Sequence, residues 1–206
     1  QVGHVERFNG AFEAAAALVD RPRFIESHRL GTFTPRGTDV SVVVDLMIHD
    51  IDLVLSLLGG DPIVELRASG AGVLTGSPDI VNARLEFKGG CVANLTASRI
   101  SREPLRKIRF FQENLYVSVD LRGRTVEAFR KADGVDAGTV GGDPAAFIRP
   151  VRVDIDEGEP LAKEIGSFLA ACAGAAQPAV TGADGLEALR VAETILDRIR
   201  DGGGGS

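Results

Sequence analysis

Apolar and polar residues alternate through the middle of the chain, from about residue 63 to residue 155. The alternation is clearest in residues 81–88 and 114–121, where every second position is apolar, and residues 151–155 repeat it. A period of two places successive side chains on opposite faces of a strand. Together with an extended segment near the N-terminus, this pattern predicts strands at residues 23–30, 63–73, 79–88, 91–100, 105–112, 114–121, 124–131 and 148–155.

Helical patterns lie on both sides of this region. An alanine-rich run at residues 11–19 follows Asn9, whose side chain can cap a helix, and Ser41 precedes the apolar run 42–58. Two amphipathic segments close the chain, at residues 160–173 and 184–200. The start of the chain, residues 1–6, is predicted as a short strand, and residues 133–146 as a loop.

These elements predict an α+β fold with a large, open, mostly antiparallel sheet of about seven to eight strands and helices packed on one face. The other face would carry mixed residues such as Val92, Thr96, Tyr116 and Thr125. Such a surface suits a partner better than bulk water, and we expect a homo-oligomer to form through it. Residues 201–206 end in GGGGS, which is typical of an engineered flexible linker, a natural glycine-rich tail being the alternative.

Composition narrows the class of protein. The chain has 206 residues, of which 44% are hydrophobic and 25% charged, so it is not a disordered chain. The net charge of −6 disfavours a nucleic-acid-binding surface, and no apolar run is long enough to span a membrane. Cys91 and Cys172 have no metal-site spacing and suggest no disulfide framework, so we expect a cytoplasmic protein.

Candidate chemistry lies in the apolar run 42–58. It contains five polar residues, of which Asp45, His49, Asp52 and Ser56 are spaced as one stripe of a helix and Asp50 is not. A carboxylate one turn from an imidazole raises the pKa of the imidazole and orients it, which suits a general acid or base. Two alternatives stay open: a solvated helix edge with an ordinary ion pair, and a metal site formed by Asp45, His49 and Asp52.

Motifs for other chemistries are missing. The sequence has no G-x-G-x-x-G, no G-x-x-x-x-G-K-[ST] and no G-x-S-x-G. His4 and His28 fall in predicted strands, where a structural role is the more common one. Three arginines could bind a phosphate or a carboxylate, although isolated arginines are usually surface residues: Arg7, Arg29 and Arg36.

Three segments resemble the glucose–fructose oxidoreductase/inositol dehydrogenase family (Gfo/Idh/MocA). Residues 1–9 are similar to the strand and turn that leave its nucleotide-binding domain. Residues 45–52 resemble its D-x-x-x-H active-site helix, and residues 181–186 resemble the segment that opens its last helix. The resemblance covers nearly all of residues 1–200 and is greatest to the branch that acts on UDP-N-acetylglucosamine-type sugars at C3. Gly10 stands where the family often has proline.

The resemblance implies a C-terminal substrate-binding and oligomerisation domain at residues 10–200, with residues 1–9 as the remnant of a nucleotide-domain strand and junction. In this family an N-terminal Rossmann domain binds NAD or NADP, and the lysine of an E-K-P motif joins the catalytic pair. Neither is in this sequence, so we expect no cofactor to bind this chain and no turnover by it alone. A truncated or engineered non-catalytic scaffold, derived from such a domain, is the alternative function.

Site residues follow from the same resemblance. His49 would be the acid or base at a sugar hydroxyl of a small-molecule substrate, and Asp45 would be its partner. The resemblance and the spacing together imply four further substrate-binding candidates: Arg7, Asn9, Asp52 and Arg36.

Overall fold

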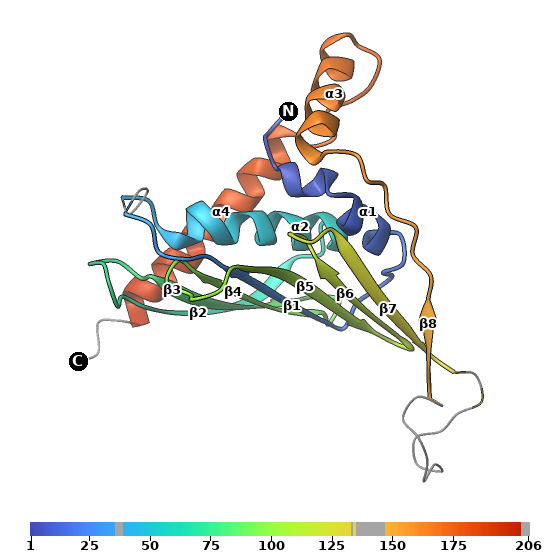
Figure 1. The fold of residues 1–206 in the computed structure, drawn as a ribbon. Helices are drawn as coiled ribbons and strands as arrows, with labels where there is room; N and C mark the ends of the chain where they lie inside the picture. Colours follow the sequence, from blue (N-terminus) through green and yellow to red (C-terminus); the bar gives the residue numbers. More distant parts are fainter. Residues whose placement is uncertain (36–38, 133, 135–146, 203–206) are drawn as a thin grey trace.

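The computed structural model describes residues 1–35, 39–132, 134 and 147–202, which form one sheet with helices on one side of it (Figure 1). The sheet has eight strands in the order β2-β3-β4-β1-β5-β6-β7-β8. Every neighbouring pair is antiparallel except β1 and β4, which run parallel. The predicted α+β class and open, mostly antiparallel sheet are therefore confirmed.

The strands lie close to where the alternation predicts them. They are β1 (Phe24–Leu30), β2 (Ile63–Ala71), β3 (Ile80–Phe87), β4 (Val92–Ser98), β5 (Leu105–Gln112), β6 (Leu115–Asp120), β7 (Thr125–Lys131) and β8 (Ile148–Val151). β8 is shorter than predicted, because pairing with β7 ends at Val151. The predicted loop at 133–146 lies, except for residue 134, outside the described residues, as do Arg36 and the end of the tail.

The prediction of a strand at residues 1–6 is wrong. The chain instead forms a short 3₁₀ helix, η1 (Val5–Phe8). The N–H of Val2 donates to the carbonyl of Val180, and the N–H of His4 donates to the carbonyl of Val2. The first residues are thus held against the segment before the last helix, away from any strand edge.

Helices α1 (Gly10–Ala16), α2 (Ile48–Leu58) and α4 (Gly182–Gly202) lie on the same side of the sheet in Figure 1, whereas α3 (Pro160–Cys172) projects away from it. Asn9 caps α1, as predicted, by accepting a hydrogen bond from the N–H of Ala11. Ser41 accepts one from the N–H of Val44, and Gly59 ends α2 in the left-handed conformation with φ +58°. The described helices include none that is long and apolar enough to cross a membrane.

The hydrophobic core fills the space between the sheet and these helices. Alternate strand residues point into it, such as Ile25, Leu95 and Phe110, and they meet Ile51 and Ile195 from α2 and α4. The opposite sheet face has no helix over it in Figure 1. This arrangement leaves the start of α2 between the sheet, η1 and α4, which is where the candidate site lies.

Candidate active site

The helix with the predicted polar stripe begins as a π-helix, η2 (Val43–Met47), before it continues as α2. A π-turn holds more residues than an α-turn, so residues on its two sides no longer share one face. Asp45 is exposed, His49 is partly buried, and Asp52 is only 1% exposed. The interpretation of a solvated helix edge is therefore wrong for Asp52, and the four polar residues do not share one environment.

Asp52 and Arg7, two of the predicted substrate-binding residues, bind each other. Nε of Arg7 lies 2.8 Å from Oδ2 of Asp52, and Nη2 lies 2.6 Å from Oδ1. Burial disfavours the charge of Arg7, but Asp52 outweighs burial and raises the pKa of the arginine. Arg7 also lies 3.7 Å from Asp184 at the start of α4. The pair joins η1 to α2 and α4, which gives both residues a structural function.

A second ionic cluster lies beside it and is more deeply buried. Arg29 of β1 donates to both carboxylate oxygens of Asp50, at 2.9 and 3.0 Å, and to Oε1 of Glu6 at 3.0 Å. Burial lowers the pKa of Arg29, but the two carboxylates outweigh it and raise this pKa above its ordinary value. Each charge removed from water here is compensated by a hydrogen-bonded partner of opposite sign.

The sequence interpretation missed this cluster. It treated Arg29 as an isolated arginine and left Asp50 out of the stripe. A signal was present, because Ile25, Ser27 and Arg29 share one face of β1 and that face is buried. An arginine on a buried strand face needs an acidic partner, and Asp50 in an otherwise apolar helix is such a residue.

Asn9 has no polar atom left over for a ligand among its described contacts. It is 2% exposed and caps α1 with its carbonyl oxygen. Its amide nitrogen donates to the carbonyl of Leu121 at 2.9 Å and to Glu6 at 3.2 Å. These bonds give Asn9 a structural role, and its substrate-binding role stays a prediction without support from the geometry.

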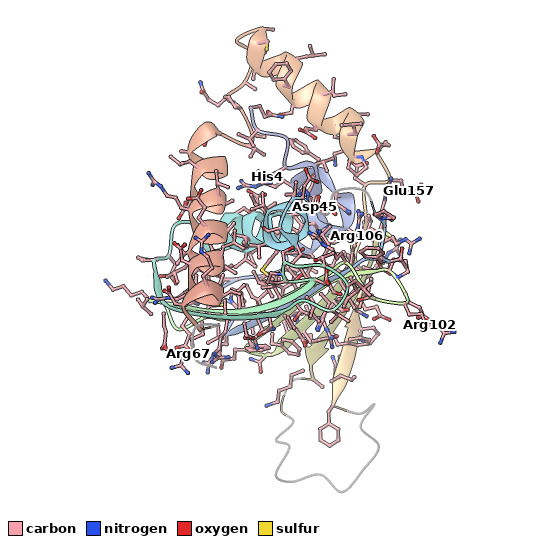
Figure 2. The ribbon with its side chains drawn as sticks, turned by 90° about the vertical axis from the view of Figure 1, so that its left-hand side faces the viewer. His4, Asp45, Arg67, Arg102, Arg106 and Glu157 are labelled. Carbon is pink, nitrogen blue, oxygen red and sulfur yellow. The ribbon has the colours of Figure 1, made fainter. Side chains whose placement is uncertain are left out.

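His49 lies at the edge of the buried cluster. Its Nδ1 is buried and has no hydrogen-bond partner in the described part of the chain. Its ring meets the ring of His4 edge-on, with centroids 6.1 Å apart. Figure 2 places His4 and Asp45 on the helix side of the sheet.

The expectation that Asp45 raises the pKa of His49 is wrong. Burial lowers the pKa of His49, and so does the charge of Arg29, while Asp50 and Glu6 act in the opposite direction without prevailing. Within the described residues no hydrogen bond or ion pair joins Asp45 to His49. The imidazole is therefore neutral near neutral pH, with a nitrogen that can accept a proton.

The metal alternative gains no support, because the described residues contain no group of three His, Cys, Asp or Glu side chains that could hold a metal ion. Arg36, the remaining substrate-binding candidate, lies outside these residues. The structure thus brings together Arg7, Asp52 and His49, and adds His4, Glu6, Arg29 and Asp50 to the site.

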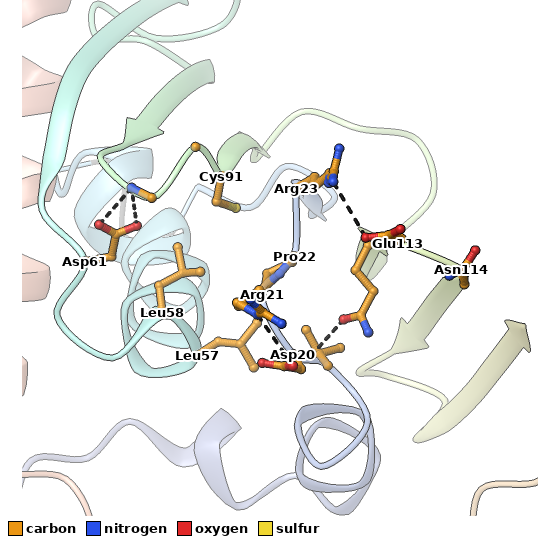
Figure 3. Close-up of a pocket in the computed structure, with 14 residues that line it drawn as sticks. Asp20, Arg21, Pro22, Arg23, Leu57, Leu58, Asp61, Cys91, Glu113 and Asn114 are labelled. Atoms are coloured by element: carbon orange, nitrogen blue, oxygen red, sulfur yellow. Dashed lines mark hydrogen bonds and ion pairs between the residues drawn. The ribbon is translucent and has the colours of Figure 1, made fainter.

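A hollow of about 900 Å³ lies elsewhere, at the far end of α2. Figure 3 shows Leu57 and Leu58 on one side of it and the ion pair of Arg23 and Glu113 on another. At 1.5 Å per residue, Leu58 is about 13 Å along the helix from His49. None of the predicted site residues lines this hollow.

Comparisons with known proteins point to one family. Residues 3–116 match the family model described as the GFO/IDH/MocA C-terminal domain. UDP-N-acetylglucosamine 3-dehydrogenase from Acidithiobacillus ferrooxidans is 40% identical over 173 residues, which are 84% of this chain and 53% of that protein. The chain therefore spans about half the length of this relative.

Solved structures agree on the fold. The structure of the A. ferrooxidans enzyme superposes with a TM-score of 0.85 at 35% identity, covering 96% of this chain and 61% of that one. An aldose-aldose oxidoreductase from Caulobacter crescentus gives a TM-score of 0.78 at 18% identity, covering 97% of this chain and 61% of that one. At such low identity the second match shows the fold alone.

Proposed function

The chain belongs to the GFO/IDH/MocA family, as its sequence resemblance predicted, and from this premise we propose that it forms the substrate-facing part of an NAD(P)-dependent dehydrogenase that acts on a sugar nucleotide. The relative with 40% identity, a UDP-N-acetylglucosamine 3-dehydrogenase, supports the substrate class. The observation that carries the proposal is His49, a partly buried imidazole with a lowered pKa. Its Nδ1 is buried, so Nε2 is the nitrogen that remains for a substrate hydroxyl.

In the proposed reaction His49 accepts the proton of the substrate hydroxyl, and the hydride of the carbon that bears this hydroxyl would pass to the nicotinamide of the cofactor. A neutral imidazole is the form that can accept this proton, and burial together with Arg29 keeps His49 neutral. Asp45 precedes it on the same helix and is exposed, so its carboxylate is available to a neighbouring hydroxyl of the sugar. The two buried ionic clusters fix the positions of η1, α2 and β1 relative to one another around this imidazole.

The described residues do not fit NAD(P) itself. A dinucleotide binds where a glycine-rich turn joins a parallel strand to a helix N-terminus. The described sheet has a single parallel pair, β1 with β4, and the sequence has no G-x-G-x-x-G. We therefore assign the cofactor, and the acceptance of the hydride, to protein outside these residues.

Turnover of a chimaera tests the proposal. The 206-residue chain is joined behind the part of the A. ferrooxidans enzyme that it does not match, and oxidation of UDP-N-acetylglucosamine is followed by NADH or NADPH formation. His49→Ala is expected to lower kcat by about 10²–10⁴, the usual contribution of a general acid or base. Asp45→Asn is expected to lower it less, because the imidazole remains.

Thr194 provides a control outside both proposed surfaces, because it is exposed on α4 and its hydroxyl donates to the carbonyl of Arg190 in the same helix, so Thr194→Ala should leave kcat unchanged. His49→Ala should also leave the melting temperature of the 206-residue chain nearly unchanged. A large loss of melting temperature, with activity per folded molecule preserved, would show that His49 is structural. A rise in KM with unchanged kcat would show that it only binds substrate.

We also propose that the open sheet face joins two copies of this chain. Four aromatic rings cross it in a row, with centroids 5.1–6.3 Å apart: Phe24, Phe111, Tyr116 and Phe129. Glu26 and Arg109 lie on the same face as an ion pair at 3.3 Å, so the face carries both charges and can complement itself.

Sedimentation of the purified chain tests this interface. We expect a dimer or tetramer at tens of micromolar, and a monomer for Tyr116→Glu. Leu161→Glu serves as the control, because Leu161 is an exposed apolar residue on α3, away from the sheet. An oligomer that is unaffected by Tyr116→Glu but lost in Leu161→Glu would locate the interface on α3 instead.

A further inference from the structure

Arg106 lies in β5 directly opposite Arg29 of β1. It shares the helix side of the sheet with Ile108 and Phe110, and Figure 2 shows it on that side. Like charges directly across a strand pair destabilise a sheet. Glu6, which lies 3.6 Å from Arg106, offsets part of this repulsion, so the second guanidinium balances the charge of the cluster without being buried in it.

Arg106 differs from the other arginines of the site in its exposure to solvent and in its ion-pair partners. The side chains of Arg7 and Arg29 are 16% and 4% exposed, and each makes a two-pronged bond to a carboxylate. The side chain of Arg106 is 53% exposed, and its described ion pair is a long one of 3.6 Å to Oε1 of Glu6. Its guanidinium makes no hydrogen bond to any described residue.

Glu6 satisfies Arg106 only in part. It already accepts hydrogen bonds from Arg29 at 3.0 Å and from Asn9 at 3.2 Å. At 3.6 Å the attraction to Arg106 is weaker than a hydrogen-bonded pair, and half of the guanidinium faces water. A planar fork of N–H donors directed at solvent is the geometry that binds phosphate oxygens.

We propose that Arg106 binds the diphosphate of the sugar-nucleotide substrate. The substrate class rests on the proposed function above. In such a molecule the diphosphate is attached to C1 of the sugar, and a single ring carbon, C2, separates C1 from C3, so an anion site must lie close to the catalytic imidazole. Glu6 contacts Arg106 on one side and acts on the charge of His49 on the other, which gives this proximity.

Neighbouring cations are less suited to this role. Lys107 follows Arg106 in β5 and alternates to the opposite face of the sheet. Arg102 is exposed in the turn before β5, and Figure 2 shows it pointing away from the body of the molecule. Arg102 is therefore a matched control: it has the same charge and is four residues away, with its side chain directed elsewhere.

Calorimetric titration of the 206-residue chain with UDP at low ionic strength tests the proposal. Arg106→Ala is expected to weaken binding by about tenfold or more, the effect of losing one charge-assisted fork. Arg106→Lys keeps the charge without the fork and should recover only part of the affinity. Arg102→Ala should bind as the wild-type chain does, and inorganic diphosphate should compete with UDP in wild type but not in Arg106→Ala.

Melting curves of each variant exclude unfolding as the cause of lost binding. UDP affinity that is equal in wild type and Arg106→Ala, or no UDP binding by the wild-type chain at millimolar concentration, would overturn the proposal. A different outcome is possible: UDP binding depends on Arg106, but the chimaera oxidises no sugar nucleotide. This result would support the diphosphate site and contradict the proposed reaction. In an active chimaera, Arg106→Ala should raise KM far more than it lowers kcat.

Discussion

Asp50 and Asp79 are both buried carboxylates, but the protein compensates them in different ways. Asp50 is 2% exposed and is held by the guanidinium of Arg29, from a strand 21 residues earlier. Asp79 is 0% exposed and accepts the backbone N–H groups of Val73, Leu74 and Thr75 at 2.8, 2.7 and 3.0 Å. One carboxylate is neutralised by a distant charge and the other by the dipoles of its own loop.

The difference determines what each carboxylate holds in place. The bonds of Asp50 join α2 to β1 and, through Glu6, to η1, so three parts of the fold depend on one buried cluster. The side-chain bonds of Asp79 close only the loop between β2 and β3, where Val73 and Leu74 are left 65% and 59% exposed. We therefore expect loss of the first to affect the whole domain and loss of the second to affect one loop.

The largest effect is expected for Arg29→Met, which removes the cation and leaves Asp50 and Glu6 buried without it. Breaking a buried pair from one side costs about 3–5 kcal/mol. Urea unfolding monitored by circular dichroism measures the loss. Adding Asp50→Leu should recover part of it, because a buried apolar residue carries no uncompensated charge. A single variant as stable as the wild-type chain would contradict the structural role of the cluster.

A smaller effect is expected for Asp79→Ala, which leaves three backbone N–H groups of a loop without their acceptor. The melting temperature should fall by a few degrees, and limited proteolysis should cleave the loop at residues 72–79 faster. Asp120→Ala is a matched control, because Asp120 also accepts backbone N–H groups in a turn, at 2.9 Å, but in a more exposed place. An equal fall in melting temperature for Asp79→Ala and Asp120→Ala would contradict the expectation that the more buried carboxylate contributes more to stability.

Asp79→Asn isolates the charge of this carboxylate. Burial raises the pKa of Asp79, but the N–H groups of Val73 and Leu74 outweigh it and hold the pKa well below its ordinary value. A lowered pKa stabilises the folded form above the unfolded pKa of about 3.9, and this contribution disappears as the pH falls through the folded pKa. The stability difference between wild type and Asp79→Asn should therefore shrink below about pH 4. A difference that grows in acid would contradict this assignment.

The smallest effect is expected for the pKa of His49. The charges of Arg29, Asp50 and Glu6 act on this pKa, whereas Asp79 is not among its causes. Burial and Arg29 lower the pKa of His49, so its NMR titration midpoint should lie below about 6.5, the ordinary value for histidine. Asp45→Asn should leave the midpoint nearly unchanged, because no bond joins the two side chains in the described structure. A midpoint above 6.5 that falls in Asp45→Asn would restore the carboxylate–imidazole pair that the sequence suggested.

Local signals in the sequence were sufficient for most of the fold. The alternation in residues 81–88 and 114–121 placed β3 and β6 because a strand shows the period of its two faces directly. Asn9 and Ser41 marked helix starts because caps act through bonds to residues close by in the chain. The D-x-x-x-H spacing directed attention to the helix that carries the proposed site, although it assigned Asp45 an influence on His49 that the structure does not have.

The arrangement of charged residues in the candidate site followed only from the tertiary structure. The π-turn at 43–47 changes which residues share a face, and alternation or α-helical spacing cannot reveal it. Arg29, Asp50 and Glu6 meet from a strand, a helix and a 3₁₀ turn. An arginine on a buried strand face indicates that an acidic partner exists, but the sequence pattern does not say that Asp50 and Glu6 both contact it.

The sequence by itself therefore determined the sheet, the helix caps and the family, because each depends on short-range periodicity or on contiguous motifs. The packing of the elements decided which arginines pair with buried carboxylates. It also left the guanidinium of Arg106 half exposed. The physical reason is that burial and the proximity of charges are properties of the folded arrangement, to which residues far apart in the chain contribute together.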